Sequence, residues 1–179
     1  MEAILAYDLN NGISKNGIIP WKSKTDINFF YNITKGNIII MGKNTFFSLP
    51  EKFRPLPNRV NIVLTNNPTI YSYDEKYINK QELIFTNNEN IHEEILKNQN
   101  KYNEMYSFLN PNFKIIIIGG KQIYEKYFPL CKSVWVTRIK NCYQCDLFIN
   151  YDFEKQFKAH QIYKEDKELI ILKYFNYYI

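Results

Sequence analysis

The sequence has 179 residues, of which 45% are hydrophobic and 23% are charged, with a formal net charge of +5. This composition is ordinary for a globular domain, and the length suffices to bury a core without disulfide bonds. No apolar run approaches the length of about 20 residues that spans a bilayer, and the N-terminus lacks a basic region with a cleavage site. We therefore expect a cytoplasmic protein and exclude a membrane span.

The cysteines, Cys131, Cys142 and Cys145, are few and odd in number, which argues against a disulfide framework. Cys142 and Cys145 have the spacing of half a zinc site or a redox motif, but no second ligand pair accompanies them. We expect ordinary thiols in a reducing compartment and no metal. The lysines are scattered, so nucleic-acid binding through phosphate contacts is not expected.

Strands and helices are predicted to alternate along the chain. Continuous apolar runs that are too short for helices predict strands buried on both faces of a sheet. In chain order, the expected strands cover residues 2–9, 38–41, 60–64, 83–85, 113–118 and 133–139. The expected helices cover residues 26–35, 43–49, 89–108 and 121–128.

The connections carry their own signals. Glycine and asparagine predict a loop over residues 10–22, and three prolines predict an irregular link over residues 50–57. Turn signals and one more short strand are expected over residues 66–81. Beyond residue 153, alternating apolar and polar residues predict a terminal hairpin.

These elements imply βαβ units around a mostly parallel sheet. The sequence therefore predicts an α/β fold with a mostly parallel central sheet, an antiparallel C-terminal hairpin and flanking helices. We expect a single domain over residues 1–179, with a surface insertion around residues 66–110.

Two of the strand-to-helix junctions contain glycine: Gly42-Lys43-Asn44-Thr45 and Gly119-Gly120-Lys121-Gln122. The start of a helix favours an anion, and glycine lets a phosphate approach the backbone. A tight turn alone also explains either glycine. Two such junctions, each with an adjacent lysine, favour a dinucleotide, although neither has the G-x-G-x-x-G spacing of a Rossmann domain.

Asp26 lies at the start of the first expected helix, where an acid is also common as a cap or first-turn residue. Asp26, Phe29, Phe30 and Ile33 follow the spacing i, i+3, i+4 and i+7, which places the carboxylate on the inward apolar face. A buried carboxylate needs a partner, and the paired N–H donors of a 2-amino-4-oxo-pyrimidine ring provide one. Apolar surroundings also raise its pKa, which suits proton transfer.

Two further segments have functional and structural interpretations. Residues 12–21 contain two glycines and end in Pro-Trp, which predicts a flap that excludes water from a reacting ring; a surface loop is the alternative. Arg54-Pro55-Leu56-Pro57-Asn58-Arg59 places a guanidinium before a strand, where it suits a carboxylate; a surface arginine is the alternative.

In chain order these features resemble the dihydrofolate reductase family over nearly the whole chain. Eight stretches carry the resemblance: I-L-A-Y, G-I-S-K-N-G-I-I-P-W, T-D-I-N-F-F, I-I-I-M-G-K-N-T-F, S-L-P-E-K-F-R-P-L-P-N-R, I-V-L-T-N, I-I-I-I-G-G-K-Q-I-Y and V-T-R-I. The resemblance implies NADPH-dependent reduction of 7,8-dihydrofolate to 5,6,7,8-tetrahydrofolate, for thymidylate and purine synthesis. It also implies a monomer that binds antifolates.

The resemblance assigns the substrate site residue by residue. Asp26 would bind the pterin edge and favour protonation at N5, Thr137 would share its hydrogen bonds, and Trp21 would hold water beside it. Arg59 would bind the glutamate carboxylate of folate. The expected walls of the site are Ile4, Leu5, Ile27, Phe30, Leu49, Leu56 and Ile118.

The resemblance also assigns the NADPH site. Its members are expected to face the nicotinamide, hold the pyrophosphate or meet the 2′-phosphate of the adenosine. They are Ala6, Ile13, Gly42, Lys43, Asn44, Thr45, Leu64, Thr65, Asn66, Gly119, Gly120, Lys121, Gln122, Ile123 and Tyr124.

Cys145-Asp146-Leu147-Phe148 resembles the family segment in which an aspartate pins the flap. Two other functions are alternatives to the expected one. A pyrimidine reductase of riboflavin synthesis would keep the fold and NADPH, but Asp26 and Arg59 argue against it. A catalytically idle protein that binds nucleic acid is the alternative from a different class.

Overall fold

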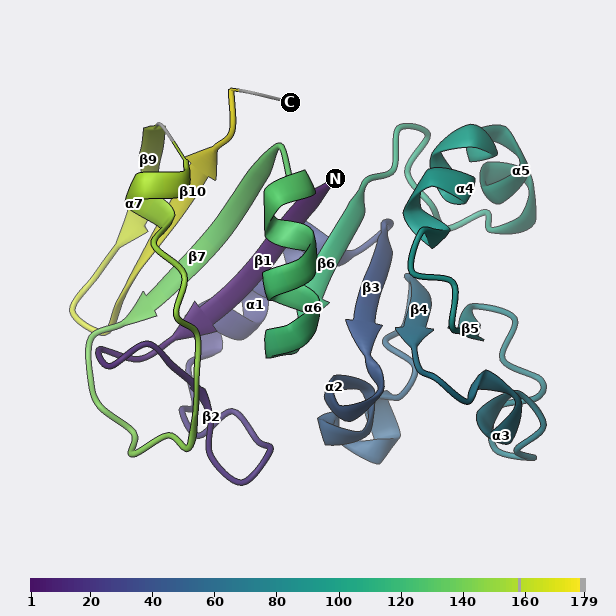
Figure 1. The fold of residues 1–179 in the computed structure, drawn as a ribbon, viewed down its shortest axis with the longest axis horizontal. Coiled ribbons are helices and arrows are strands. Elements are labelled where there is room, and N and C mark those ends of the chain that lie inside the picture. Colours follow the sequence, from purple (N-terminus) through teal and green to yellow (C-terminus); the bar gives the residue numbers. More distant parts are fainter. Residues whose placement is uncertain (158, 178–179) are drawn as a thin grey trace. The chain divides into compact units, whose positions relative to one another are not determined.

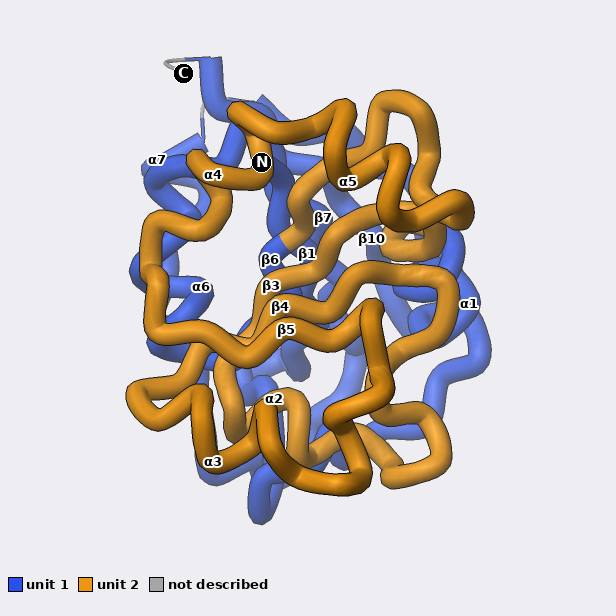
Figure 2. The backbone as a smooth tube through the Cα atoms, turned by 90° about the vertical axis from the view of Figure 1, so that its right-hand side faces the viewer, with its two compact units in different colours: residues 1–32, 117–179 blue, residues 33–116 orange. Residues whose placement is uncertain are grey.

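The structure, a computed structural model, describes residues 1–157 and 159–177. These residues form two compact units: unit 1 comprises residues 1–32, 117–157 and 159–177, and unit 2 comprises residues 33–116 (Figures 1 and 2). The single domain expected over residues 1–179 stays a prediction, and residue 158 and the last two residues of that range lie outside the described part. Among the described residues, no helix has the length and apolar character needed to cross a membrane.

Unit 1 is built on strands from both ends of the chain. β1 pairs in parallel with β7, and β10 pairs antiparallel with both β7 and β9. The predicted C-terminal hairpin is therefore confirmed. The strand order is β6-β1-β7-β10-β9, with bounds β1 (Glu2–Tyr7), β6 (Ile115–Gly119, its last three residues in this unit), β7 (Ser133–Ile139), β9 (Ala159–Glu165) and β10 (Leu169–Phe175).

Two helices lie on opposite faces of these strands, as both views show (Figures 1 and 2). α1 (Lys24–Thr34) begins where the Ser23 hydroxyl accepts a hydrogen bond from the backbone N–H of Asp26 at 3.2 Å, which caps the first turn. On the other face lies α6 (Lys121–Tyr127), followed by a 3-10 turn, η2 (Phe128–Leu130). The short helix α7 (Phe153–Gln156) precedes β9.

The strand β7 distributes its side chains between these two faces. Because successive side chains of a strand point to opposite sides, Thr137 and Arg138 face opposite ways. Phe29 of α1 packs against Trp135, two positions before Thr137, with 5.3 Å between the ring centroids. Thr137 therefore faces α1, and we call the face of Arg138 the back face.

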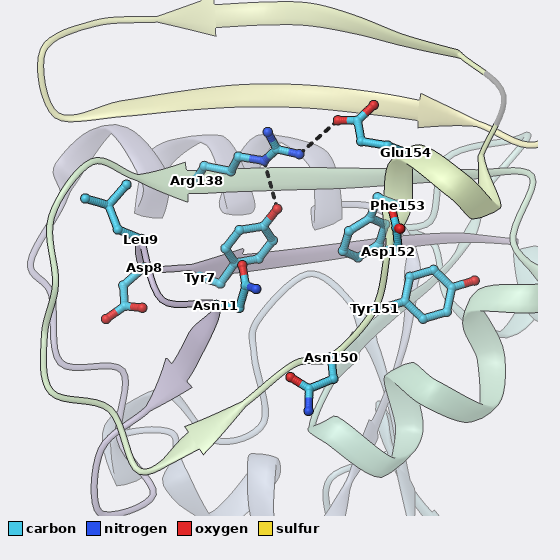
Figure 3. Close-up of a pocket in the computed structure, with 10 residues that line it drawn as sticks. All are labelled: Tyr7, Asp8, Leu9, Asn11, Arg138, Asn150, Tyr151, Asp152, Phe153 and Glu154. Carbon is cyan, nitrogen blue, oxygen red and sulfur yellow. Dashed lines mark hydrogen bonds and ion pairs between the residues drawn. The ribbon is translucent and has the colours of Figure 1, made fainter.

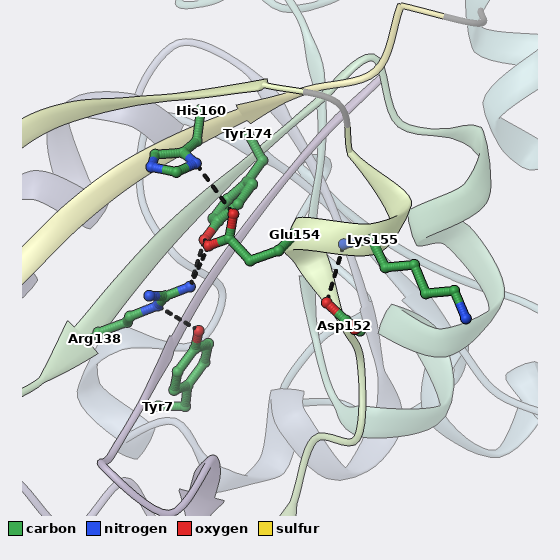
Figure 4. Close-up of polar contacts among 7 residues, drawn as sticks. All are labelled: Tyr7, Arg138, Asp152, Glu154, Lys155, His160 and Tyr174. Atoms are coloured by element: carbon green, nitrogen blue, oxygen red, sulfur yellow. Dashed lines mark hydrogen bonds and ion pairs between the residues drawn. The ribbon is translucent and has the colours of Figure 1, made fainter.

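A polar network occupies the back face (Figure 4). The Arg138 guanidinium donates to the Tyr7 hydroxyl at 2.8 Å, to the Glu154 carboxylate at 3.1 Å and to the Tyr174 hydroxyl. Tyr174 donates to Glu154 at 2.5 Å, and His160 lies 3.2 Å from its other oxygen. The hydrogen bond from Tyr174, with help from Arg138, holds the pKa of Glu154 below its ordinary value. The network joins β1, β7, β10 and α7.

Unit 2 contains three parallel strands in the order β5-β4-β3. The apolar runs of β3 and β4 are buried, as the sequence predicts for strands covered on both faces, whereas β5 is mostly half-buried. The bounds are β3 (Ile38–Gly42), α2 (Lys43–Ser48), η1 (Glu51–Phe53), β4 (Val60–Leu64), α3 (Pro68–Ser72), β5 (Leu83–Thr86), α4 (Ile91–Lys97) and α5 (Gln99–Met105). Together with unit 1, these elements confirm the α/β fold with mostly parallel pairing.

Two secondary-structure predictions within residues 66–110 are wrong. The strand expected within residues 66–81 is absent from that fully described segment, which instead contains the helix α3. Pro68 occupies its first turn, where a missing N–H costs nothing. The single helix expected over residues 89–108 is two, α4 and α5, and Asn98 lies between them as the cap of both.

The three cysteines are free thiols. Cys131 is buried and its Sγ donates to the backbone oxygen of Tyr127 at 3.2 Å; burial raises the pKa of Cys131 to about 12. Burial and the nearby carboxylate of Asp8 raise the pKa of Cys145 to about 11. Cys142 is exposed.

The back-face network predicts a stability effect for Arg138→Met. The change leaves the Tyr7, Tyr174 and Glu154 groups without their common hydrogen-bond donor. Because the arginine side chain is 37% exposed, water can replace some of the lost hydrogen bonds. We expect the free energy of unfolding in urea to fall by about 1.5 kcal/mol. Lys76→Met, which breaks an exposed ion pair with Glu51, should leave the free energy of unfolding nearly unchanged. Equal losses in both variants would contradict a special role for the network.

Candidate active site

Asp26 lies in the first turn of α1, on unit 1, and is half-buried. The first turn of α1 is capped by the hydroxyl of Ser23 and not by Asp26. The Asp26 carboxyl instead faces Trp21, whose indole Nε1 lies 3.5 Å from Oδ2, a long hydrogen bond. The carboxyl is thereby held at the site with little compensation from the protein.

Burial raises the pKa of the Asp26 carboxyl above its ordinary value, and the Thr137 hydroxyl and the Trp21 indole N–H lower it by less. Within the described part of the chain, the buried Thr137 Oγ1 forms no hydrogen bond of ordinary geometry. The Thr137 hydroxyl therefore acts on the Asp26 carboxyl without a hydrogen bond of ordinary geometry to it, and its hydrogen-bonding capacity remains for a bound molecule. An acid with a raised pKa beside an unsatisfied hydroxyl suits proton transfer.

The glycine pair after β6 adjoins a buried tyrosine. Gly119 has a φ of +115°, a conformation that favours glycine, and a Cβ at this position would lie 3.0 Å from the Tyr124 ring. The Tyr124 hydroxyl donates to the backbone oxygen of Ile4 in β1 at 2.7 Å. Burial, and the nearby negative charge of Asp26, raise the pKa of Tyr124. Tyr124, Ile4 and Asp26 are therefore neighbours around the end of β6.

The flap, residues 12–21, contains a short strand that the sequence did not predict. β2 (Gly12–Ser14) pairs antiparallel with β8 (Leu147–Phe148). Asp146 accepts a hydrogen bond from the backbone N–H of Asn16 at 2.6 Å, and its own N–H donates to the Ser14 oxygen at 3.0 Å. Asp146 thus contacts the flap, as the resemblance implied. Ile13, expected at the nicotinamide, is buried in β2.

Arg59, on unit 2, is buried rather than on the surface, since only 3% of it is exposed. Its Nε donates to the Pro57 oxygen at 3.0 Å and its Nη1 to the Thr34 hydroxyl at 2.9 Å. These contacts fix the plane of the guanidinium, and a fixed fork suits a carboxylate. The alternative of a surface arginine is therefore wrong.

The turn before Arg59 is held by a buried amide. The Asn61 side chain accepts from the N–H of Leu56 at 2.9 Å and donates to the Leu56 oxygen at 3.0 Å and the Arg59 oxygen at 2.8 Å. Leu56, an expected wall residue, is buried by this arrangement. Leu49, which follows α2, is half-buried.

The two cofactor segments of unit 2 lie at one edge of its sheet. Gly42 at the end of β3 is in register with Leu64 at the end of β4. Because these strands are parallel, residues 42–45 and residues 64–66 follow from the same edge. Gly42 caps α2 without a side chain, so the first backbone N–H groups of the helix remain available to an anion.

The remaining expected residues of unit 1 are placed as follows. In register, Ala6 lies opposite Thr137, whereas Leu5 alternates to the back face. Ile27 is 62% exposed next to Asp26, and Ile118 is buried in β6. The first turn of α6 holds the residues expected at the pyrophosphate, which are Lys121, Gln122 and Ile123.

A pocket of about 610 Å³ lies outside this site (Figure 3). It is lined by Tyr7, Asp8, Leu9, Asn11, Arg138 and residues 150–154. Tyr7 and Arg138 belong to the back face, so this pocket does not contain Asp26. Thr137, on the face of α1, and Asp26 in α1 lie on the opposite side of these strands.

Sequence reasoning missed two supporting residues. Ser23 stands three positions before Asp26, a spacing typical of a helix cap. Asp8 precedes two asparagines and a glycine, a pattern typical of a turn organised by an aspartate side chain. Both signals are present in the sequence.

Comparison with known proteins agrees with this arrangement. A family model described as "Dihydrofolate reductase" matches residues 1–82 and 72–178. A dihydrofolate reductase of Ureaplasma parvum is 34% identical over 153 residues, covering 86% of this chain and 83% of that protein. One of Aedes albopictus is 32% identical, covering 84% of this chain and 81% of that protein.

A solved structure gives the same result. Dihydrofolate reductase from Enterococcus faecalis, complexed with NADP(H) and RAB-propyl, has a TM-score of 0.70 and 26% identity, covering 97% of this chain and 94% of that one. The fold and the acid-centred site define an α/β oxidoreductase. The matches over nearly the whole chain are more specific still, and this chain belongs to the dihydrofolate reductase family.

The raised pKa of Asp26 predicts how Asp26→Asn changes stability with pH. Between the ordinary pKa of 3.8 and the raised folded value, the folded chain keeps a proton that the unfolded chain has lost. Stability therefore falls as pH rises through this window. We expect Asp26→Asn to raise the free energy of unfolding at pH 7, with the gain vanishing toward pH 4.

Asp166→Asn is the matched control of opposite sign. Backbone N–H groups of Glu168 and Leu169 lower the pKa of Asp166, so its carboxylate stabilises the fold above its ordinary pKa and stops doing so as pH falls. Urea unfolding at several pH values measures both variants. A pH-independent difference for Asp26→Asn would show that the carboxyl is not perturbed.

Proposed function

We propose that this chain reduces 7,8-dihydrofolate to 5,6,7,8-tetrahydrofolate with NADPH and so supports thymidylate and purine synthesis. The observation that carries the proposal is the half-buried Asp26 carboxyl, which faces Trp21 and the unsatisfied hydroxyl of Thr137. A pterin offers the paired N–H donors that such a carboxylate lacks. Membership of the family supports the same reaction.

Asp26 binds the pterin edge and favours the protonated form of the ring at N5. Its raised pKa keeps a proton available closer to neutral pH than an ordinary aspartate does. Thr137 completes the hydrogen bonds on the same side, and Trp21 positions a water molecule next to the carboxyl. The apolar walls, which include Ile4 and Ile118, exclude other water from the ring.

The residues of unit 1 fit a nicotinamide ring. Gly119 carries no side chain where a Cβ would already meet Tyr124, so a flat ring can approach its backbone. Ala6, opposite Thr137, is small. When bound, NADPH supplies the hydride that goes from C4 of the nicotinamide to C6 of dihydrofolate.

The phosphate groups require backbone N–H donors and cations. We assign the pyrophosphate to Lys43, Asn44 and Thr45 at the start of α2 and to residues 121–123 at the start of α6. Lys43, Thr65 and Asn66 are assigned to the 2′-phosphate. This assignment favours NADPH over NADH, because only NADPH carries that phosphate.

Three further properties are proposed for this chain from its sequence. A cytoplasmic location and a monomeric state remain predictions from the sequence. Binding of antifolates also remains a prediction for this chain, and the Enterococcus faecalis complex with RAB-propyl supports it by analogy.

The direct test follows NADPH oxidation by the purified chain at 340 nm. We expect absorbance to fall when dihydrofolate is added and to stop falling when methotrexate is added. NADH should support a lower kcat/KM than NADPH. No dihydrofolate-dependent oxidation at any pH from 5 to 8 would overturn the proposed function.

Asp26→Asn is expected to lower turnover at pH 7 by about 100-fold or more, because a positioned acid contributes about that much. NADPH affinity, measured by fluorescence titration, should change little. The loss should shrink as pH falls, since solvent then protonates the substrate directly. Full activity of Asp26→Asn at pH 7 would remove Asp26 from the mechanism.

Arg59→Lys tests the assignment of the folate carboxylate. Lysine keeps the charge but loses the fixed fork, so we expect KM for dihydrofolate to rise about tenfold with kcat retained. A reduced pterin without the glutamate serves as the internal control, because its KM should not respond to the change. A parallel rise for both substrates would indicate general damage rather than loss of carboxylate binding.

A further inference from the structure

Asp8 is a buried carboxylate at the end of β1 that the proposed chemistry does not use (Figure 3). It is 1% exposed. One of its oxygens accepts the backbone N–H groups of Asn10 and Gly12, each at 2.9 Å. The other accepts the N–H of Tyr143 at 2.9 Å and lies 3.6 Å from the Cys145 sulfur. This ring of donors compensates the buried charge.

The contacts of Asp8 keep it ionised. Burial alone would raise the pKa of Asp8. The pKa nevertheless lies below its ordinary value, because the N–H groups of Tyr143, Gly12 and Asn10 donate to the carboxylate. A neutral amide in the same place accepts through one atom only. The charge and both oxygens are therefore needed to hold all of these contacts together.

Asp8 joins the flap to a second segment, residues 141–146, which we call the support segment. Gly12 begins the flap, and Tyr143 lies in the middle of the support segment. The junction is closely packed, since a Cβ on Gly12 would lie 2.4 Å from the Cβ of Cys145. Next to it, the N–H of Leu9 donates to the oxygen of Asn141 at 3.1 Å.

The support segment also reaches the candidate active site through a side chain. The Tyr143 ring packs edge-on against Trp21, with 5.8 Å between centroids and 62° between planes. Trp21 in turn lies 3.5 Å from the Asp26 carboxyl. A continuous set of contacts therefore runs from Asp8 through Tyr143 and Trp21 to Asp26, entirely within unit 1.

We propose that Asp8 is a positioning residue, which locks the base of the flap to the support segment and, through the Tyr143 ring, holds Trp21 against Asp26. The inference rests on the proposed function, because Asp26 and Trp21 act in that reaction. It differs from the flap contact of Asp146, because Asp8 binds the start of the flap and fixes the tyrosine that touches Trp21.

Asp8→Asn tests the lock with little change in size. The amide NH₂ must face the N–H groups on one side, so one of the two segments loses its acceptor. We expect the hydride-transfer rate in single-turnover experiments to fall about tenfold, as small displacements at a reacting centre do, with NADPH affinity unchanged. Because the Trp21 N–H lowers the pKa of Asp26, its release should also move the midpoint of the pH–rate profile upward.

Asp166→Asn is the matched control for a turn carboxylate. Asp166 accepts the N–H groups of Glu168 and Leu169 at 2.8 and 3.0 Å in the hairpin between β9 and β10. Its loss should reduce stability without changing the rate or the pH midpoint. If Asp8→Asn behaves in the same way, Asp8 is a structural residue and the proposal is overturned.

Tyr143→Leu removes the ring but keeps the backbone N–H that Asp8 binds. It should reproduce the slower hydride transfer and the upward pH midpoint, and it carries the test if Asp8→Asn fails to fold. In the double variant the two effects should not add, because both act through Trp21. Full additivity, or an unchanged rate in Tyr143→Leu, would overturn the route through the ring.

A readout without substrate separates this proposal from the proposed function. In a Trp135→Phe background, Trp21 is the remaining tryptophan of the chain. Asp8→Asn and Tyr143→Leu should each increase the acrylamide quenching of Trp21 fluorescence, whereas Asp166→Asn should not. Unchanged quenching would sink the positioning role even in an active reductase, and increased quenching would support it even in a chain that does not reduce dihydrofolate.

Discussion

The partly desolvated charge of Asp26 is the constraint on which unit 1 depends. A carboxylate removed from water is costly unless donors surround it, and the protein supplies Asp26 with only the nearby Thr137 hydroxyl and the long contact of the Trp21 indole. The first turn of α1 offers some further compensation, since the start of a helix favours negative charge. The rest of the compensation is left to a bound ring. The fold therefore keeps this carboxyl in place while leaving its hydrogen-bonding capacity unfilled, as a site that must recognise a ligand requires.

Two other acids of unit 1, the buried Asp8 and the exposed Glu154, show the opposite arrangement. Asp8 accepts several backbone N–H groups and Glu154 accepts from Tyr174 and Arg138, and in both cases the pKa lies below its ordinary value. Satisfied networks of this kind make their surroundings rigid. Side chains alternate between the two faces along β1 and β7. Polar groups with hydrogen-bond partners therefore lie on the back face, and the Thr137 hydroxyl, which has none among the described residues, lies on the side of α1. The groups available to a ligand and the groups that make the fold rigid thus lie on opposite sides of the same two strands.

The sequence predicted the parts of this molecule that depend on local patterns. The buried strands β3, β4 and β6 are apolar runs, α1 follows from the spacing around Asp26, and the glycine junctions mark the helix starts. The parts it missed depend on partners that are remote in the chain. The short strand β2 exists because of β8, and Asp8 meets Tyr143 only in the folded chain. Within residues 66–81, weak periodicity allowed a strand and a short helix equally, and Pro68 at the first turn favours the helix.

The three thiols give this chain a practical property. Cys131 and Cys145, with pKa values raised to about 12 and about 11, stay protonated at neutral pH, and a protonated thiol is a poor nucleophile. Cys142 is exposed and stands directly beside Tyr143. A maleimide dye is therefore directed to Cys142, without engineering of the chain. Such a covalent reporter would sit on the segment that supports the flap, where opening and closing could be followed one molecule at a time.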